Sequence, residues 1–335
     1  MTATRVTLIT EQLRQPVPGG IGTNIRGLVQ GLRESSDHTV DVRTWQSRLP
    51  VPVRRRLWDY GVGRVRGDVV HAASLNFPPT SAPLVVTIMD LTWRDVPETF
   101  APGSVEWHER NFQRALTRAD HIVVPSTLTL ERILAAGAPP ERVTLIECGC
   151  DHLPPADDAG AARLVEGEFL LTVGTREPRK NLARLVEAYR QARPRFPEPL
   201  PLVVVGPYGW GEPDDLGDVV TTGLVDDAVL AGLYARARAF AYVPLIEGFG
   251  LPVVEAMRAG TPVVTSTRVP SAGGAALEVD PLDVDAIADA LVATVTDGDV
   301  RRDLVARGTA RAAQITWRNA ADQHVALWRS LAASR

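Results

Sequence analysis

Two glutamates in one short stretch have the type and spacing that most directly suggest chemistry. Glu247 and Glu255 are separated by seven residues, and the intervening sequence begins Gly-Phe-Gly-Leu-Pro. Strand-like runs flank the stretch at residues 239–243 and 261–265. A glycine loop between a strand and a helix leaves backbone N–H groups free, where an anion or a set of hydroxyls can bind. The pattern therefore predicts a ligand site, with an ordinary glycine turn and a surface glutamate as the alternative.

Three cations gather after another candidate strand. The apolar run 169–173 ends in Gly174, and Arg176, Arg179 and Lys180 follow shortly after it. A helix is expected to open here, and positive charge at a helix N-terminus is unfavourable unless an anion lies there. A diphosphate would supply that anion, whereas a solvated basic turn is the alternative interpretation.

A second glycine-rich segment, residues 18–22, lies between the first strand run and a helix expected over residues 24–33. Glycines here would let the backbone approach a ligand closely, although a plain turn has the same composition. The segment does not match the dinucleotide fingerprint, because no acidic residue is evident at the right distance on a second strand.

Composition favours a two-domain enzyme. The 335 residues suit two domains of ordinary size, and 45% of them are hydrophobic. The net charge of −4 argues against a nucleic-acid-binding protein. The two cysteines, Cys148 and Cys150, cannot build a zinc site from thiolates alone. We find no apolar run of membrane-spanning length and no signal-peptide pattern, so a cytoplasmic location is expected.

Short apolar runs alternate with helical patterns along the chain, as in parallel sheets covered on both faces. The series restarts after residues 151–160, a polar stretch with two prolines that indicates a linker. We therefore predict two doubly wound α/β domains with a cleft between them and ligands beyond the carboxyl ends of the strands. The runs are residues 5–10, 39–43, 68–71, 84–89, 121–125, 143–146, 169–173, 201–205, 239–243 and 261–265.

The string from Glu247 to Glu255 resembles the EX7E signature of retaining glycosyltransferases of family four, which have the GT-B fold. Residues 174–182 resemble the G-T-x-E-P-R-K-N-L form found in the same family. The resemblance implies two Rossmann-like domains facing a central cleft. Expected boundaries are an acceptor-binding domain at 1–152, a nucleotide-sugar-binding domain at 165–317, and a helix at 318–335 that packs back on the first domain.

The resemblance also implies how a nucleotide-sugar donor is held. Glu255 would hold the ribose, and backbone groups near Val225 would hold a base that the pattern does not specify. The loop containing Gly20 would face the donor diphosphate. The sugar hydroxyls would be bound by Glu247 and by the backbone of Gly248, Phe249, Gly250 and Leu251.

Charge neutralisation is expected to come from side chains. Lys180 and Arg176 would stabilise the departing diphosphate, a task that a metal performs in other transferases, so we expect neither a metal nor a cofactor. The nearest acidic cluster, Asp214 and Asp215, is expected in a surface loop. Asp90 would activate or position the acceptor hydroxyl, with a simple loop or cap residue as the alternative.

Two departures from the family pattern bear on specificity. Met89 stands where most relatives have histidine, and the loop at residues 267–276 lacks the usual glutamate. Methionine cannot donate a hydrogen bond but packs well against a methyl group. A 6-deoxy sugar donor is therefore one hypothesis, and the other is that Met89 only fills space.

Together these features predict a retaining, metal-independent glycosyltransferase. It would move a hexose or deoxyhexose from a nucleotide sugar to a hydroxyl of a glycan, a glycolipid or a small glycoside. A non-catalytic nucleotide-sugar-binding protein and a GT-B nucleotide-sugar epimerase are the alternatives. The basic segment Arg54, Arg55 and Arg56 is expected to be a solvated helix face, with peripheral contact with anionic lipid at the inner membrane face as the alternative.

Overall fold

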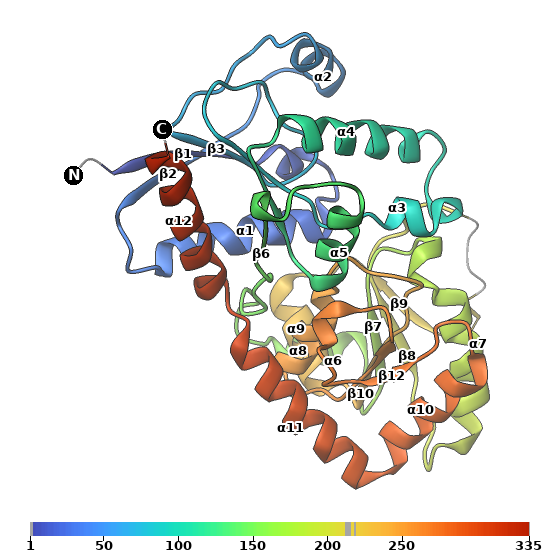
Figure 1. The fold of residues 1–335 in the computed structure, drawn as a ribbon. Coiled ribbons are helices and arrows are strands. Elements are labelled where there is room, and N and C mark those ends of the chain that lie inside the picture. The colour runs from blue at the N-terminus through green and yellow to red at the C-terminus, as the bar shows by residue number, and fades with distance from the viewer. Residues whose placement is uncertain (1–2, 212–215, 218, 335) are drawn as a thin grey trace. The chain divides into compact units, whose positions relative to one another are not determined.

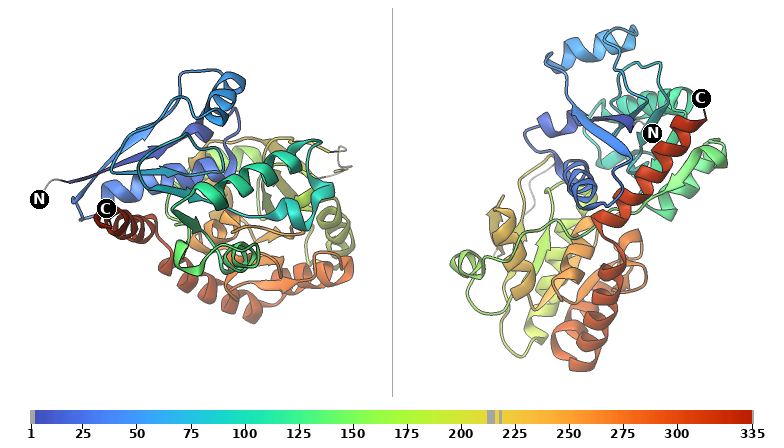
Figure 2. Two further views of the ribbon diagram at one scale, coloured as in Figure 1. Left: turned by 45° about the horizontal axis from the view of Figure 1, so that its top comes forward. Right: turned by 90° about the vertical axis from the view of Figure 1, so that its left-hand side faces the viewer.

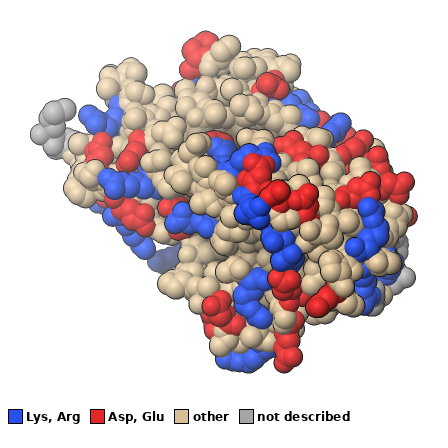
Figure 3. All heavy atoms as spheres, turned by 90° about the horizontal axis from the view of Figure 1, so that it is seen from below, with Lys and Arg blue, Asp and Glu red and all other residues tan. Residues whose placement is uncertain are grey.

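The computed structural model describes residues 3–211, 216–217 and 219–334, excluding the side chains of residues 52, 55 and 59. Asp214 and Asp215, which were expected in a surface loop, lie outside the described residues. On the face displayed in Figure 3, positive and negative side chains are interspersed. That face thus carries no large field of a single sign. None of the described helices is long and apolar enough to span a membrane.

The chain divides into two units, each with its own sheet (Figure 1). Unit 1 contains Met1–Leu91, Gly103–Gly149 and Thr316–Arg335, and unit 2 contains Thr92–Pro102 and Cys150–Ile315. The segment Thr92–Pro102 falls within the sequence range expected for the first domain, yet its contacts assign it to unit 2.

Unit 1 contains a six-stranded sheet in the order β2-β1-β3-β4-β5-β6, with every pairing parallel. All residues of the inner strands β3, β4 and β5 are buried. Burial on both faces explains why these strands read as continuous apolar runs in the sequence. The strands are β1 (Thr4–Ile9), β2 (Val40–Trp45), β3 (Val69–Ala72), β4 (Leu84–Thr87), β5 (His121–Val124) and β6 (Val143–Leu145).

The described helices of unit 1 alternate with its strands, except that β4 follows β3 with no helix between them and that α12 comes after the helices of unit 2 in the chain (Figure 1). They are α1 (Gly19–Glu34), α2 (Val51–Asp59), α4 (Ser104–Arg118), α5 (Thr127–Ala135) and α12 (Trp317–Ala333), with short 3-10 turns at Glu11–Arg14 and Pro140–Arg142.

Unit 2 repeats the architecture, with six parallel strands in the order β12-β11-β10-β7-β8-β9. Helices α7 and α10 pack together and share one apolar core with the sheet. The strands are β7 (Leu170–Val173), β8 (Leu202–Val205), β9 (Val220–Gly223), β10 (Ala239–Tyr242), β11 (Val263–Ser266) and β12 (Leu277–Val279). The helices are α3 (Thr92–Asp95), α6 (Asp158–Leu164), α7 (Leu182–Ala192), α8 (Asp227–Arg236), α9 (Leu251–Arg258), α10 (Val284–Thr296) and α11 (Gly298–Gln314).

The glycine segment after β1 is helical, and the expectation of an open loop there was wrong. Helix α1 begins at Gly19, and the N–H of Gly22 donates to the carbonyl of Pro18 at 3.2 Å to close the first turn. A Cβ at Gly22 would lie 2.3 Å from Pro18 Cβ, so glycine is required there by packing. Proline fixes φ near the helical value, which starts the helix earlier than the apolar periodicity indicated.

Helix α12 packs against α1 within unit 1, as both views in Figure 2 show. Two glycines of α1 permit the close approach. A Cβ at Gly27 would lie 2.0 Å from Trp317 Cε2, and a Cβ at Gly31 would lie 2.1 Å from the Trp317 carbonyl oxygen. The start of α12 is therefore fixed by direct contact with the α1 backbone.

Helix α2 does not present its arginines as predicted. Arg54 is fully buried, pairs with the buried carboxylate of Glu11, and lies 5.1 Å from the ring centre of Trp58. A buried carboxylate is strongly unfavourable without a cation, so Glu11 draws this arginine inward. Arg54 therefore cannot contact a lipid surface, and Arg56 is the member of the basic segment whose described side chain is exposed.

Three aromatic side chains connect α12 to the sheet of unit 1. Trp328 Nε1 donates to His71 Nδ1 at 3.2 Å, and His71 Nε2 lies 2.8 Å from Thr87 Oγ1. The His71 and His324 rings stack with centroids 5.3 Å apart. Because an indole N–H can only donate, His71 Nδ1 must accept and the ring must be neutral. Burial lowers the pKa of His71 well below its usual value and that of His324 to about 4.

This cluster predicts that unit 1 is destabilised by acid. Each buried histidine excludes a proton that the unfolded chain takes up below about pH 6.5. The free energy of unfolding should fall as pH decreases from about 6.5. By about pH 4, His324 alone should lower it by on the order of 3 kcal/mol. Urea unfolding at several pH values measures this loss.

His324→Gln, which cannot titrate, should flatten the dependence of unfolding free energy on pH. His38→Gln removes an exposed histidine and should leave the dependence unchanged. An unaltered slope in His324→Gln would show that acid sensitivity arises elsewhere.

Candidate functional site

The two most suggestive sequence stretches meet at one edge of the unit 2 sheet. Lys180 lies in a 3-10 turn, Pro178–Lys180, shortly after β7, and Glu247 lies in the loop after β10. Strands β7 and β10 are hydrogen-bonded neighbours and run parallel. Their carboxyl ends therefore lie side by side, which is where doubly wound sheets bind ligands.

One carboxylate oxygen organises this edge. Glu247 Oε1 accepts hydrogen bonds from Lys180 Nζ at 2.5 Å, from the Tyr242 hydroxyl at 2.7 Å and from Arg179 Nη1 at 2.8 Å. Glu247 is only 8% exposed. Burial by itself would raise the pKa of Glu247, but Arg179 and Lys180 outweigh burial and lower that pKa to about 2. The carboxylate is thus a permanent anion at neutral pH.

Asn181 fixes the turn that carries the two cations. Its φ of 59° is left-handed, a conformation that asparagine tolerates better than most residues. Its side-chain amide donates to the carbonyls of Val243 and Pro281 at 2.9 and 2.8 Å. Arg179 is held further by Glu177, whose carboxylate lies 2.6 Å from Nη2. The cations are therefore placed by a rigid turn joined to the end of β10.

The glycine loop leads into α9 as the sequence predicted. Gly250 has φ of 97° at the N-terminus of the helix, where no side chain caps the backbone. Ser271, from the loop that lacks the expected glutamate, donates from Oγ to the Gly250 carbonyl at 2.8 Å and from its backbone N–H to Phe249 at 2.9 Å. The altered loop thus supports the glycine loop directly, and the N-terminus of α9 remains suited to an anion or hydroxyls.

Glu255 lies in α9 and is buried, with partners of its own. The Tyr234 hydroxyl donates to Oε2 at 2.8 Å, and His152 Nε2 lies 3.2 Å from Oε1. Tyr234 lies at apolar helical spacing with Leu230 and Leu233 in α8, a pattern typical of a core residue, and it is fully buried. Its hydroxyl nevertheless orients a candidate ligand-binding carboxylate.

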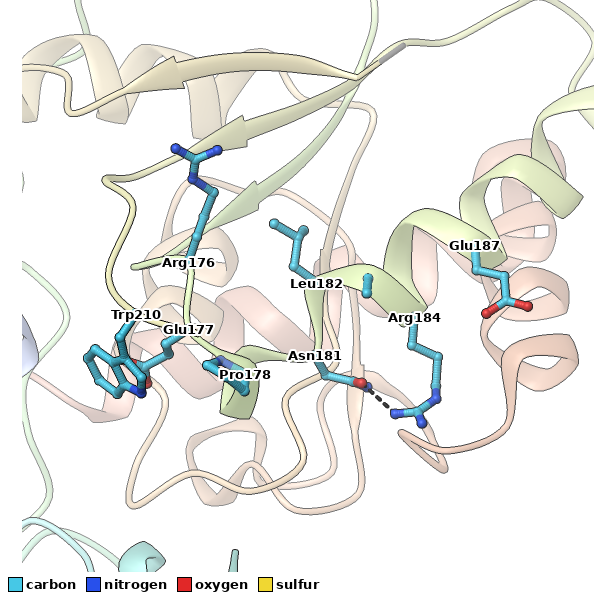
Figure 4. A pocket seen from close by; sticks show the side chains of 9 residues that line it. Arg176, Glu177, Pro178, Asn181, Leu182, Arg184, Glu187 and Trp210 are labelled. Carbon is cyan, nitrogen blue, oxygen red and sulfur yellow. Dashed lines mark hydrogen bonds between the residues drawn. The ribbon is translucent and has the colours of Figure 1, made fainter. Parts of the chain in front are cut away.

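Arg176 is not part of the Glu247 network that the described residues form. It lines a pocket of about 470 Å³ (Figure 4). Its guanidinium lies 5.7 Å from the ring centre of Tyr208. Of the two arginines in the predicted cation cluster, Arg179 is the one that lies beside Glu247. The pocket is lined by Arg176, Glu177, Pro178, Asn181, Leu182, Ala183, Arg184, Glu187 and Trp210.

The remaining candidates are placed as follows. Val225 is half-buried between β9 and α8 in unit 2. In unit 1, Gly20 is exposed in the first turn of α1, where a Cβ would meet no other atom within 4 Å, and Asp90 follows β4. The carbonyl of Met89, beside Asp90, accepts from Thr129 Oγ1 at 3.2 Å. Unit 2 therefore brings Glu247, Lys180 and the glycine loop together, while Gly20 and Asp90 belong to unit 1.

Sequence reasoning did not assign functional roles to Tyr242, Tyr234 and His152, and it included Arg179 only as one of three cations that could meet an anion. Tyr242 ends an apolar strand and Tyr234 has core spacing, so periodicity concealed both hydroxyls. The available signal was a tyrosine at the carboxyl end of a parallel strand, where polar groups meet ligands. Within the described part of the chain, no group of three or more His, Cys, Asp or Glu residues could hold a metal ion.

Solved structures share this architecture. The chain matches HepE of Anabaena in complex with UDP and glucose with a TM-score of 0.73 and 18% identity, covering 98% of this chain and 100% of that one. It also matches WaaG, a glycosyltransferase involved in lipopolysaccharide biosynthesis, with a TM-score of 0.68 and 16% identity, covering 96% and 99%. The fold is thus the GT-B fold of glycosyltransferases.

Sequence comparison agrees. Residues 167–297 match the family of glycosyl transferases group 1. The chain is 32% identical to the O-antigen chain mannosyltransferase B of Escherichia coli, over 83% of this chain and 78% of that protein. It is 35% identical to the phosphatidyl-myo-inositol mannosyltransferase of Mycolicibacterium smegmatis, over 45% and 42%. The chain therefore belongs to the group 1 glycosyltransferases.

Proposed function

We propose that the protein is a retaining glycosyltransferase that moves a mannosyl residue from a nucleotide sugar to an acceptor hydroxyl without a metal ion. The observation that carries the proposal is the set of three donors on Glu247 Oε1, two of them cationic. Such an array is a preorganised cation site beside an uncapped helix N-terminus, the arrangement that stabilises charge on a leaving diphosphate.

In this proposal each group has a separate task. Lys180 neutralises the diphosphate as the glycosidic bond breaks, and Arg179 keeps Glu247 charged. Glu247 accepts hydrogen bonds from the sugar hydroxyls, and the backbone N–H groups of the glycine loop donate to them. Glu255 accepts hydrogen bonds from the ribose hydroxyls. Binding the sugar and the diphosphate at adjacent sites aligns the bond to be broken, which lowers the entropic part of the barrier.

The donor sugar is inferred from the relatives named as mannosyltransferases. Mannose carries a 6-hydroxyl, whereas Met89 suggested a 6-deoxy sugar. The two donors can be compared directly by competition between GDP-mannose and GDP-rhamnose. If the 6-deoxy donor is preferred and Met89→His reverses that preference, the mannosyl assignment fails.

The acceptor is proposed to be a sugar-containing or lipid-linked hydroxyl, with Asp90 in unit 1 as the group that positions it. Peripheral membrane contact is proposed for the exposed part of α2 and its flanks. Arg56 is exposed there, together with Val53 and Tyr60. Apolar side chains beside a cation are typical of a surface that binds anionic lipid.

A panel of nucleotide sugars, with and without excess chelator, tests the proposal. We expect release of nucleoside diphosphate that persists in chelator and a product with the anomeric configuration of the donor. Loss of activity in chelator with rescue by magnesium would contradict the metal-free assignment. Diphosphate binding without any transfer would instead favour a non-catalytic binding protein.

Lys180→Ala is expected to weaken nucleoside diphosphate binding about 10- to 100-fold and nucleoside binding much less. A charge-assisted contact to phosphate contributes about 1.5–3 kcal/mol, and the nucleoside lacks that contact. Calorimetric titration with GDP and guanosine, and with UDP and uridine, measures both affinities. Equal losses for a diphosphate and its nucleoside would place Lys180 away from the phosphates.

A further inference from the structure

The hydrogen-bond directions around Tyr242 are fixed by chemistry. Lys180 Nζ lies 2.7 Å from the tyrosine oxygen, and that oxygen lies 2.7 Å from Glu247 Oε1. An ammonium group can only donate, and a carboxylate can only accept. The hydroxyl must therefore accept from Lys180 and donate its one proton to Glu247.

The phenol stays protonated in this position. Tyr242 is 2% exposed, and burial, together with the adjacent Glu247 carboxylate, raises its pKa well above 10. Its ring stacks on that of Phe240, with the ring planes 19° and the centroids 6.0 Å apart. The hydroxyl is consequently a fixed donor across the pH range in which an enzyme of this family would work.

The two partners of Tyr242, Lys180 and Glu247, each keep a hydrogen-bonding position that a ligand could use. Two of the three N–H bonds of Lys180 have partners among the described residues, and its side chain remains 18% exposed. All three donors to Glu247 in the described chain use Oε1, which leaves Oε2 for another donor. Lys180 and Glu247 can thus each bind one further group while Tyr242 holds them.

We propose that Tyr242 is a positioning residue. It allows the Lys180 ammonium group to leave its hydrogen bond with Glu247 and to bind a donor diphosphate instead. This inference rests on the proposed function. When a diphosphate draws the ammonium group toward itself, Glu247 loses its shortest hydrogen bond. The Tyr242 hydroxyl continues to donate to the same oxygen, so the carboxylate stays charged and oriented toward the sugar.

A phenylalanine at this position would remove the hydroxyl, which accepts from Lys180 and donates to Glu247. The aromatic ring and its packing on Phe240 would remain, but withdrawal of Lys180 would leave Oε1 with Arg179 as its one donor among the described side chains. Diphosphate binding would then be weakened, because Glu247 would lose the hydrogen bond from Lys180 with no tyrosine hydroxyl to donate in its place. Nucleoside binding would be unaffected, because a nucleoside does not attract Lys180.

Calorimetric titration of Tyr242→Phe, Lys180→Ala and the double variant tests the inference, with GDP, UDP and their nucleosides as ligands. Tyr242→Phe should lower the affinity for the diphosphate about three- to tenfold and leave the affinity for the nucleoside unchanged. In the Lys180→Ala background the same substitution should have little further effect, because the exchange no longer occurs. Diphosphate affinity equal to wild type, or fully additive losses, would overturn the inference.

Tyr189→Phe is the matched control. It also removes a buried tyrosine hydroxyl from unit 2, one that donates to the Leu200 carbonyl at 2.8 Å. It should lower thermal stability without changing diphosphate affinity, and a loss of affinity equal to that of Tyr242→Phe would mean that both variants act only by weakening the fold.

If wild-type protein binds neither GDP nor UDP, the proposed function fails. If wild type binds and only Lys180→Ala weakens binding, the inference about Tyr242 fails alone.

Discussion

Replacing Glu247 with glutamine is expected to lower sugar transfer by about 100-fold or more while the protein remains folded. Glutamine keeps the size of the side chain but loses the charge that faces Arg179 and Lys180. Removal of one preorganised charged contact in an active site typically lowers turnover by about two to three orders of magnitude. The measurement is kcat and KM for the nucleotide-sugar donor in wild type and variant.

The expected loss is mainly in kcat, because the proposed function has Glu247 both orient the sugar and fix the cations that would meet the leaving group. Glu198→Gln, at an exposed position of the same unit, makes the same chemical change and should leave kinetics unaltered. Wild-type turnover in Glu247→Gln would remove this carboxylate from the mechanism. A large fall in unfolding temperature would instead show that its contribution is structural.

Gly31→Ala is expected to destabilise unit 1 by at least about 2 kcal/mol. The added Cβ would lie 2.1 Å from the Trp317 carbonyl oxygen and 2.4 Å from its carbon, which belong to the backbone at the start of α12. Backbone cannot move aside as a flexible side chain can, so α1 and α12 must separate. Urea unfolding followed by tryptophan fluorescence measures the loss.

Gly20→Ala provides the matched comparison in the same helix. No atom lies within 4 Å of the added Cβ, and alanine favours a helix by up to about 1 kcal/mol over glycine. Its stability should therefore be unchanged or slightly higher. Similar destabilisation by both substitutions would argue against the packing of α12 on α1 described above.

The sequence predicted all six strands of unit 1 and the four inner strands of unit 2, but it missed the two edge strands of unit 2. Continuous apolar runs marked β3, β4, β5, β7, β8 and β10 because both faces of these strands are buried. The edge strands β9 and β12 were not predicted, since they are partly exposed and polar residues interrupt their apolar runs. The N-terminus of α1 was also misplaced, because glycines and a proline conceal a helical turn from periodicity.

By itself, the sequence determined the family, the doubly wound class and the candidates Glu247 and Lys180, because a loop motif specifies its own strand–loop–helix context. Only the tertiary structure decided which groups surround them. It placed Arg179 instead of Arg176 beside Glu247, and it brought in Tyr242 from a strand that reads as plain core. It also turned Arg54 inward, where the sequence suggested a basic surface. The physical reason is common to these cases: a buried charge requires a partner, and partners are selected by distance in the folded chain, which local periodicity does not encode.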